Sequence, residues 1–342
     1  MGIYDHGFDR HRPGRRGSHH RSSGSTAKGR CPERSTRPVS SAGVCPDCRS
    51  RQVVALPRPP AAPTLSLSYR IWKDSDMSGP LPDSAEVFGR HFVDHTATGA
   101  EEVIAEELRA RGLVALGGLT TRGAVLDLAR RLMTITAHRD SDPDGLTALR
   151  PSPRRAGGAG CAGFGSGEMA VHTEGSSMPR PPRLMLLTCA RPAISGGECV
   201  LVDGREAYAH LSECDAHAAA SIARPRTAFF GSGDGHLGQV ITVTGSRRVR
   251  IRMRQDDLVR FSPLIQPYLE HWKTALDIHR HVLRLGTGQG YLLDNHRWLH
   301  GRYTFTGPRQ CWRALGEPAF ALPDGFEARH DIAAELTAGG RR

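Results

Sequence analysis

A histidine and a glutamate stand two residues apart in the segment "MAVHTEGSS", which covers residues 169–177. In an extended segment, residues i and i+2 point to the same face, so the side chains of His172 and Glu174 can converge on one small ion. The same spacing is common on strands that face solvent and in acid/base pairs. These residues alone therefore leave three interpretations open: a solvated strand face, half of a metal site, or an acid/base pair.

A further metal ligand is available more than a hundred residues later, in the segment "NHRWLHGRYTF". We expect His300, which precedes a glycine at a predicted strand end, to join His172 and Glu174. His296 is the competing candidate, and we interpret it as a packing or supporting residue. Two histidines and one carboxylate form the facial triad that binds Fe(II) and leaves positions open for a chelating cosubstrate and O₂.

The elements that position these residues change in type along the chain. Long helical periods come first, and short apolar runs bounded by Gly, Pro and Ser follow, such as "RLMLLTCA" and "ECVLVD". Thr98 and Glu101 form a candidate capping box for the first helix, and Gly112 is its predicted end. Helices are predicted over residues 99–111, 121–133 and 264–285. This order favours a mainly β domain with flanking helices over regular βαβ units.

The positive charge of the chain is concentrated at its beginning. The formal net charge is +11, but residues 1–76 hold 14 Lys and Arg against 6 Asp and Glu, which leaves +3 for residues 77–342. The first segment is rich in Arg, Ser, Gly and Pro, and we predict a disordered basic extension there. Met77 is a candidate true start. The catalytic domain is predicted over residues 77–342, and its near-neutral charge argues against nucleic acid as a partner.

Several motifs resemble one enzyme family. These are "VHTEG", the pair Pro181 and Pro182, "ARPAISGGECVLVDG" and "DNHRWLHGRYTFTGPRQCWRALG". In order and spacing, over roughly residues 85–320, they resemble the iron(II)- and 2-oxoglutarate-dependent dioxygenases related to taurine dioxygenase and clavaminate synthase. The resemblance implies a double-stranded β-helix (jelly-roll) core. It also implies Fe(II) as the metal, 2-oxoglutarate and O₂ as cosubstrates, and iron ligands at His172, Glu174 and His300.

The resemblance also implies a cation for the far carboxylate of 2-oxoglutarate. An arginine suits this role because its planar fork makes bidentate hydrogen bonds and stays charged. We expect Arg309 to be this anchor, with Arg313 facing the substrate or supporting it, although the two roles could be exchanged. Cys199 stands where the family commonly carries a threonine that helps to hold 2-oxoglutarate. A thiol is a weak donor, so we expect a weaker or rearranged cosubstrate pocket.

Residues that contact the substrate are harder to predict. In "RRVRIRMRQDD" arginines alternate with apolar residues, so we expect either an exposed basic strand face or an anion contact from Arg252 or Arg254. The Gly-rich segment 229–239 is a candidate lid, from which Phe229 or Phe230 would line the pocket. The resemblance implies a small-molecule substrate, namely a free or carrier-tethered amino acid or a related intermediate of secondary metabolism, whose unactivated C–H bond is hydroxylated with release of succinate and CO₂.

Two other classes of function stay open at this point. The same three ligands could hold zinc in a hydrolase, although the chain has no His-Glu-x-x-His motif and a zinc enzyme has no need of Arg309. Alternatively the domain could be a non-catalytic binding module whose basic tail contacts nucleic acid. The longest apolar run of residues 1–76 is too short for a membrane span or a signal sequence. With scattered cysteines in addition, we expect a cytoplasmic protein with free thiols and no membrane partner.

Overall fold

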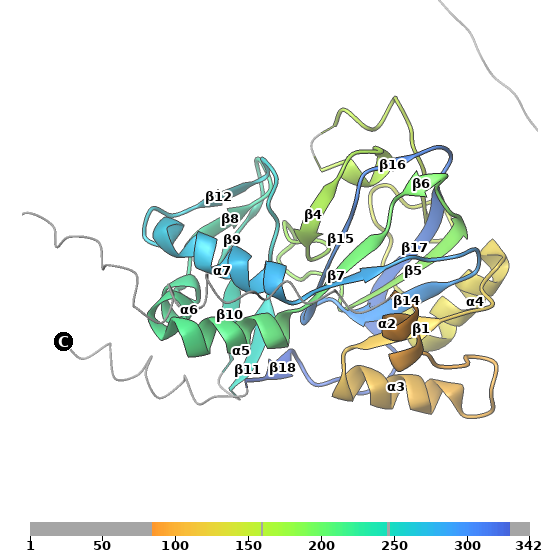
Figure 1. Ribbon diagram of the computed structural model, residues 1–342, viewed down its shortest axis with the longest axis horizontal. Coiled ribbons are helices and arrows are strands. Elements are labelled where there is room, and N and C mark those ends of the chain that lie inside the picture. The colour runs from red at the N-terminus through yellow and green to blue at the C-terminus, as the bar shows by residue number, and fades with distance from the viewer. Residues whose placement is uncertain (1–83, 159, 245–246, 329–342) are drawn as a thin grey trace, which may run out of the picture. The chain divides into compact units, whose positions relative to one another are not determined.

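Two antiparallel sheets dominate the computed structural model, which describes residues 84–158, 160–244 and 247–328 (Figure 1). The larger sheet has the strand order β1 (Leu113–Leu116), β14 (Gly290–Asp294), β5 (Leu184–Arg191), β17 (Gln310–Pro318) and β2 (Met133–Ile135), with β3 (Thr147–Leu149) also paired to β17. The smaller sheet has the order β13 (Arg280–Leu283), β7 (Cys199–Asp203), β15 (Trp298–Arg302) and β4 (Met169–His172).

Strand β5 shows how the sequence separates the two faces of the larger sheet. Leu184 and Leu186 belong to the apolar cluster that includes residues of the flanking helices. Met185, Leu187 and Cys189 belong to a second cluster, shared with residues of the smaller sheet. Because successive side chains of a strand point to opposite faces, an uninterrupted apolar run is required when both faces are buried. The run "LMLL" supplies it.

Two helices cover the outer face of the larger sheet. They are α3 (Ala100–Ala110) and α4 (Arg122–Leu132), seen beside β1 and β14 in Figure 1. The side chain of Thr121 accepts a hydrogen bond from the Ala124 amide at 3.2 Å and so caps α4. The capping box predicted at Thr98 and Glu101 was wrong. Helix α3 begins instead after Gly99, whose φ of 75° is left-handed and which supplies no side-chain cap.

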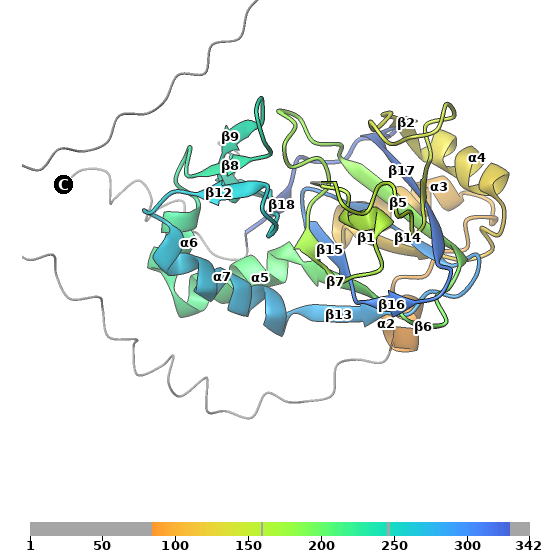
Figure 2. The same ribbon diagram turned by 90° about the horizontal axis from the view of Figure 1, so that it is seen from above.

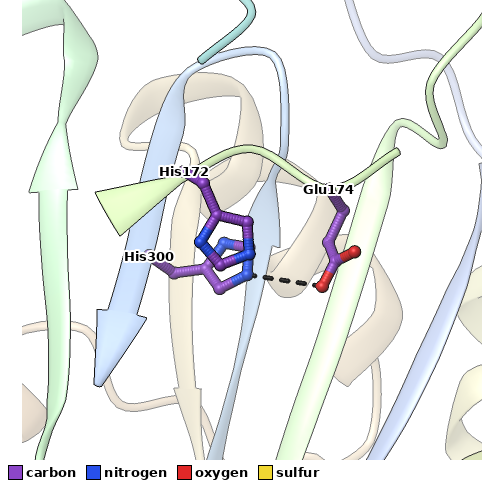
Figure 3. Close-up of side chains that lie close together, drawn as sticks. All are labelled: His172, Glu174 and His300. Atoms are coloured by element: carbon purple, nitrogen blue, oxygen red, sulfur yellow. Dashed lines mark ion pairs between the residues drawn. The ribbon is translucent and has the colours of Figure 1, made fainter. Parts of the chain in front are cut away.

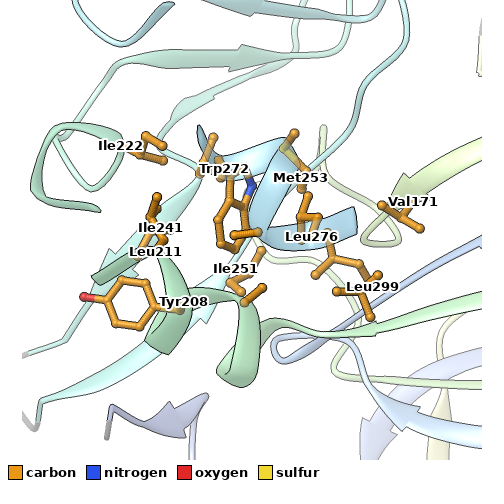
Figure 4. Packing of buried hydrophobic residues seen from close by; sticks show 14 of the residues in the cluster. Val171, Tyr208, Leu211, Ile222, Ile241, Ile251, Met253, Trp272, Leu276 and Leu299 are labelled. Carbon is orange, nitrogen blue, oxygen red and sulfur yellow. The ribbon is translucent and has the colours of Figure 1, made fainter. Parts of the chain in front are cut away.

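The segment between β7 and β13 forms a separate apolar cluster, labelled on the left of Figure 2. It contains α5 (Gly204–Cys214), α6 (Ala216–Ile222), β8 (Ala228–Phe230), β9 (His236–Gly238), β10 (Ile241–Val243), β11 (Arg248–Ile251), β12 (Val259–Phe261) and α7 (Gln266–Ile278). Fully buried Trp272 of α7 packs among Tyr208, Ile251 and Leu276 (Figure 4). The cluster also includes Val202 of the smaller sheet, so the insertion packs on that sheet.

The helices of this insertion differ from the sequence prediction. The single helix predicted over residues 264–285 ends at Ile278, and β13 begins at Arg280. Helices α5 and α6 were not predicted. Helix α5 starts at Gly204, immediately after strand β7, with the side chain of Asp203 accepting from the Arg205 amide at 3.0 Å. No loop separates the strand from the helix, so no run of turn-forming residues marks the boundary in the sequence.

The remaining described elements are short. They are α2 (Ser84–Arg90), the 3-10 turn η1 (Ala162–Phe164), the paired strands β6 (Ser195–Gly196) and β16 (Phe305–Thr306), and β18 (Phe326–Glu327). The predicted extension 1–76 and the candidate start Met77 lie outside the described residues. Among the residues that are described, no helix has both the length and the apolar character needed to cross a bilayer.

Candidate iron site

Neighbouring strands of the smaller sheet bring the two predicted histidine ligands together. His172 is the last residue of β4, His300 lies in β15, and the two are partners in the antiparallel register. Their ring centroids are 4.4 Å apart. With Glu174 they offer ligand atoms that all lie within 4.8 Å of one another (Figure 3). The structure thus joins residues separated by more than a hundred positions in the sequence.

Glu174 reaches this site by a different route from the one predicted. Strand β4 ends at His172, and Glu174 lies in the turn that follows, so the alternation of side chains along a strand does not place it. Its carboxylate is buried, with Oε1 at 3.5 Å from Nε2 of His300. The two ligands converge because the chain bends after the strand.

The protonation states at the site suit a divalent metal. The Nδ1–H of His172 donates to the Ala170 carbonyl at 2.9 Å, an arrangement that leaves its Nε2 free to ligate. Burial lowers the pKa of His172 to about 4, so the ring is neutral. Burial acts to raise the pKa of Glu174, but Arg313 and the two histidines hold it well below its usual range. A neutral imidazole and an ionised carboxylate are ligating forms, so the states of His172 and Glu174 fit a metal ion.

Arg313 contacts the site directly. It lies in β17 of the larger sheet, and its Nη1 donates to Oε1 of Glu174. Both side chains are buried. The sequence had placed Arg313 near the cosubstrate or the substrate, and in the structure its guanidinium reaches the predicted iron ligand itself.

Two further arginines lie together at another part of the site. Arg309 places its guanidinium carbon 5.7 Å from the ring centroid of Phe305, and that of Arg302 is 4.7 Å from the same ring. Both arginines are buried, yet no carboxylate of the described residues pairs with either one. Nη2 of Arg309 lies 3.8 Å from Sγ of Cys199. Burial and the neighbouring charge of Arg309 lower the pKa of Arg302 to about 10, so the guanidinium is still charged at neutral pH.

A cavity of about 850 Å³ connects these groups. Strands of the two sheets contribute His172, His300, Cys199, Tyr291, Arg302 and Arg313 to its lining, and Glu174 and Arg309 lie next to strand ends. Segments outside the two sheets contribute the outer wall, namely residues within 137–140, 160–168, 175–178, 231–235 and 254–258. The predicted lid at 229–239 therefore contributes part of its wall.

Two predicted substrate contacts lie elsewhere. Phe230 is fully buried in the apolar cluster of the insertion and does not line the cavity, because it is an inward-facing residue of β8. Arg252 follows the end of β11, and its guanidinium donates to the carbonyls of Ser176, Met178 and Pro179 at 2.6–3.2 Å. These bonds fix the loop after Glu174 and take up the donors that an anion would need.

Arg254 does line the cavity, as predicted, but it has a partner. Its Nε and Nη2 donate to the two carboxylate oxygens of Asp256, each at 2.6 Å. The predicted basic strand face is short as well, because β11 ends at Ile251. His296, the alternative ligand, donates from Nδ1 to Oδ1 of Asp324 at 2.9 Å and is absent from the described metal-binding group.

Tyr291 and Arg302 were missed by the sequence reasoning, although both line the cavity. Arg302 carried a signal, since it follows His300 and Gly301 directly and would share their strand. Tyr291 carried less, because an aromatic residue in the run "YLLD" is typical of a core strand. Only the pairing of β14 with β5 shows that it faces the interior between the sheets.

Comparisons with known proteins agree with this geometry. Residues 78–315 match the family described as "Taurine catabolism dioxygenase TauD, TfdA family". Gamma-butyrobetaine dioxygenase of Homo sapiens is 22% identical over 240 residues, which is 63% of this chain and 58% of that protein. The protein of Pongo abelii with the same name gives the same values. The chain thus spans somewhat over half the length of these curated relatives.

Solved structures show the same fold at low identity. Asparagine oxygenase in complex with Fe(II), 2S,3S-3-hydroxyasparagine and succinate is 19% identical with a TM-score of 0.54, covering 71% of this chain and 86% of that one. The non-heme iron oxygenase OrfP in complex with Fe and alpha-ketoglutaric acid is 15% identical with a TM-score of 0.52, covering 70% and 85%. The predicted jelly-roll core is thereby confirmed. The chain belongs to the TauD/TfdA family of dioxygenases, whose metal is iron and whose cosubstrate is 2-oxoglutarate.

Proposed function

We propose that this enzyme hydroxylates an unactivated C–H bond of a small molecule, with 2-oxoglutarate as cosubstrate and His172, Glu174 and His300 as the iron ligands. One observation carries the proposal. A set of two histidines and a carboxylate, with Glu174 and His300 buried and His172 half-buried, opens into the same cavity as a buried arginine that has no carboxylate partner among the described residues. Iron and 2-oxoglutarate, when bound, supply the oxidising chemistry.

The side chains of the protein would hold the cosubstrate by its charge. We assign the distal carboxylate of 2-oxoglutarate to Arg309, since a buried guanidinium needs an anion that the described chain does not supply. Arg302, stacked on the same Phe305 ring, adds a second positive charge. Tyr291 offers a hydroxyl beside the thiol of Cys199, which is a weak donor. Burial raises the pKa of Tyr291 well above its usual range, so the hydroxyl keeps its proton.

For the substrate we propose an amino acid or a related small molecule, free or tethered to a carrier protein. The similar structures include OrfP in complex with (3S)-hydroxy-L-Arg as well as the asparagine oxygenase. The cavity of about 850 Å³ exceeds what 2-oxoglutarate alone would fill. Its outer wall carries both signs of charge, with Arg254 and Asp256 on one segment and Glu168 on another. A zwitterionic group suits such a wall.

We place the reaction in the cytoplasm. The described cysteines, Cys161, Cys189, Cys199, Cys214 and Cys311, are all free. Cys189 and Cys311 are paired in the register of β5 and β17 but form no disulfide, which is typical of a reducing compartment. The zinc hydrolase gives the buried Arg309 no role and is not proposed.

The test is anaerobic addition of Fe(II) and 2-oxoglutarate, with detection of the visible metal-to-ligand charge-transfer band. We expect the band in the wild type and its loss in His172→Ala. The matched control is His296→Ala, which removes the other histidine of the region and should keep the band. A wild-type protein that binds iron without giving the band would overturn the proposed function, and loss of the band in the His296 variant would reassign the third ligand.

A further inference from the structure

The position of Glu174 needs an explanation, because no strand supports it. His172 is held by its ladder partner His300, but Glu174 lies in the turn beyond β4. A carboxylate on an unsupported turn would be a poor ligand, since its backbone could move relative to the two histidines. Some other group must therefore fix the backbone of Glu174.

Asn295 makes the contacts that a neighbouring strand would make. Its Oδ1 accepts from the Glu174 amide at 2.7 Å, and its Nδ2 donates to the Glu174 carbonyl at 3.0 Å. The same Nδ2 donates to the Pro182 carbonyl at 2.8 Å. One side-chain amide thus satisfies both backbone groups of Glu174, as a hydrogen-bonded pair does in an antiparallel ladder. Asn295 is 1% exposed, so these bonds are shielded from water.

Asn295 is itself held in place by its neighbours. The backbone N–H of Asn295 donates to the Arg183 carbonyl at 2.8 Å. The guanidinium of Arg183 in turn forms a buried ion pair with Asp294, with N–O distances of 2.7 and 2.9 Å. Asn295 also opens the turn that leads into β15, the strand that carries His300. The carboxylate ligand is therefore tied to the chain segment that delivers the distal histidine.

The other side of the ligand segment is held as well. The amide of Thr173 donates to the Met253 carbonyl at 2.9 Å, and the Met253 amide donates back to Oγ1 of Thr173 at 3.0 Å. These bonds restrain the residue between the ligands but do not touch the peptide groups of Glu174. Asn295 alone among the described residues has side-chain bonds to both of them.

We propose that Asn295 is a positioning residue that sets the place of the Glu174 carboxylate relative to the two histidines and thereby determines metal affinity. The inference rests on the proposed iron site. Partners that orient a metal ligand typically change affinity or activity about 10- to 100-fold when they are removed. We expect Asn295→Ala to weaken metal binding by an amount in this range. Asn295→Asp, which keeps the acceptor but loses both donor bonds, should fall between the wild type and the alanine variant.

The experiment measures the affinity of each full-length protein for Co(II), a spectroscopic substitute for Fe(II), by titration of its visible bands. Hydrogen exchange of residues 173–176 in the metal-free protein is the second readout. The matched control is Ser212→Ala, which removes a buried bond of 2.7 Å to the Tyr208 carbonyl in α5 without lining the cavity. We expect faster exchange and weaker Co(II) binding in Asn295→Ala, with unchanged affinity in Ser212→Ala.

The outcomes separate this inference from the proposed function. If the wild type binds no Co(II), the iron site fails and Asn295 has nothing to position. If the wild type binds Co(II) and Asn295→Ala binds it equally well, Asn295 is only structural and the inference is overturned. Equal losses of affinity in the Asn295 and Ser212 variants would also overturn it, because general destabilisation would then explain both.

Discussion

Two pairs of buried arginines differ in one respect. Arg183 and Arg297 each make a two-point ion pair, with Asp294 and Asp203 respectively, at 2.7–2.9 Å. Arg302 and Arg309 are equally buried, and both contact the ring of Phe305, but no described carboxylate pairs with them. The neutral carbonyls of Gly165 and Gly167 accept from Nη2 of Arg302 at 3.0 and 2.6 Å. A buried charge without a partner destabilises the protein unless a ligand neutralises it. The first pair therefore stabilises the fold, and the second pair is consistent with the proposed role in binding the cosubstrate.

The largest effect is expected from breaking a paired arginine. Asp203→Asn keeps an acceptor for the start of α5 but leaves Arg297 buried without a counter-charge. Removal of one partner from a buried pair costs about 3–5 kcal/mol, so the free energy of unfolding in urea should fall by this amount. The affinity for 2-oxoglutarate should stay unchanged in the fraction that is folded. Unchanged stability would show that this pair does not hold the fold.

The opposite result is expected at an unpaired arginine. Arg309→Met removes a buried charge and leaves a side chain of similar length, so the melting temperature should be equal or higher. The dissociation constant of 2-oxoglutarate should rise about 100-fold, because two charge-assisted hydrogen bonds are lost. Titration of the charge-transfer band measures it. A variant that loses stability but keeps its affinity would place Arg309 with the fold.

A half-buried base of another type, His91, sharpens the comparison. His91 lies near Arg111, and burial, followed by that positive charge, lowers the pKa of His91 to about 4. Since the unfolded chain takes up this proton near pH 6.5, stability should fall as the pH drops from 6.5 to 4 and should not fall further below 4 on account of His91.

We expect His91→Gln to remove about 2 kcal/mol of this pH dependence, allowing for partial exposure. Urea unfolding at pH 7 and at pH 4.5 in both proteins measures the difference. Equal pH dependence in wild type and variant would contradict the assignment. The imidazole of His91 thus loses its charge by releasing a proton. The guanidinium of a buried arginine stays charged and needs a partner instead.

The smallest effect is expected beside Arg309. Cys199→Thr places a hydroxyl where the thiol lies 3.8 Å from the guanidinium. One neutral hydrogen bond contributes about 1 kcal/mol, so the affinity for 2-oxoglutarate should improve about fivefold. Cys199→Ser is the control for side-chain size. Weaker binding in both variants would show that the pocket is built around the thiol.

The sequence predicted the chemistry of the site better than its geometry. The residue types of His172, Glu174 and His300, taken with the family resemblance, predicted a metal site, and the structure brings the three side chains together. The sequence did not predict that Glu174 lies beyond the strand, because the side chain that bonds to the Glu174 backbone belongs to Asn295, a residue distant in sequence. Helix α5 was not predicted for a local reason, because Asp203 is both the last residue of strand β7 and the N-cap of the helix.

Substrate contacts were the least predictable part. Phe230 was chosen as an aromatic residue of the Gly-rich segment 229–239, and Arg252 as a basic residue of the alternating run "RRVRIRMRQDD". The structure places the first in the core of the insertion and uses the second to tie down a loop. Neither assignment can be made without the fold, because burial and the carbonyls that face a guanidinium come from segments far apart in the sequence.

The walls of the cavity come from two kinds of segment, which differ in how readily evolution or engineering can change them. The candidate ligand histidines, Arg309 and Tyr291 lie on or beside the paired strands of two sheets. The outer wall comes from residues within 137–140, 160–168, 175–178, 231–235 and 254–258. Loops tolerate insertions and substitutions that sheets do not. Replacement of these segments would change which substrate the enzyme accepts and leave its oxidant the same. They are therefore the positions to vary in directed evolution of the substrate range.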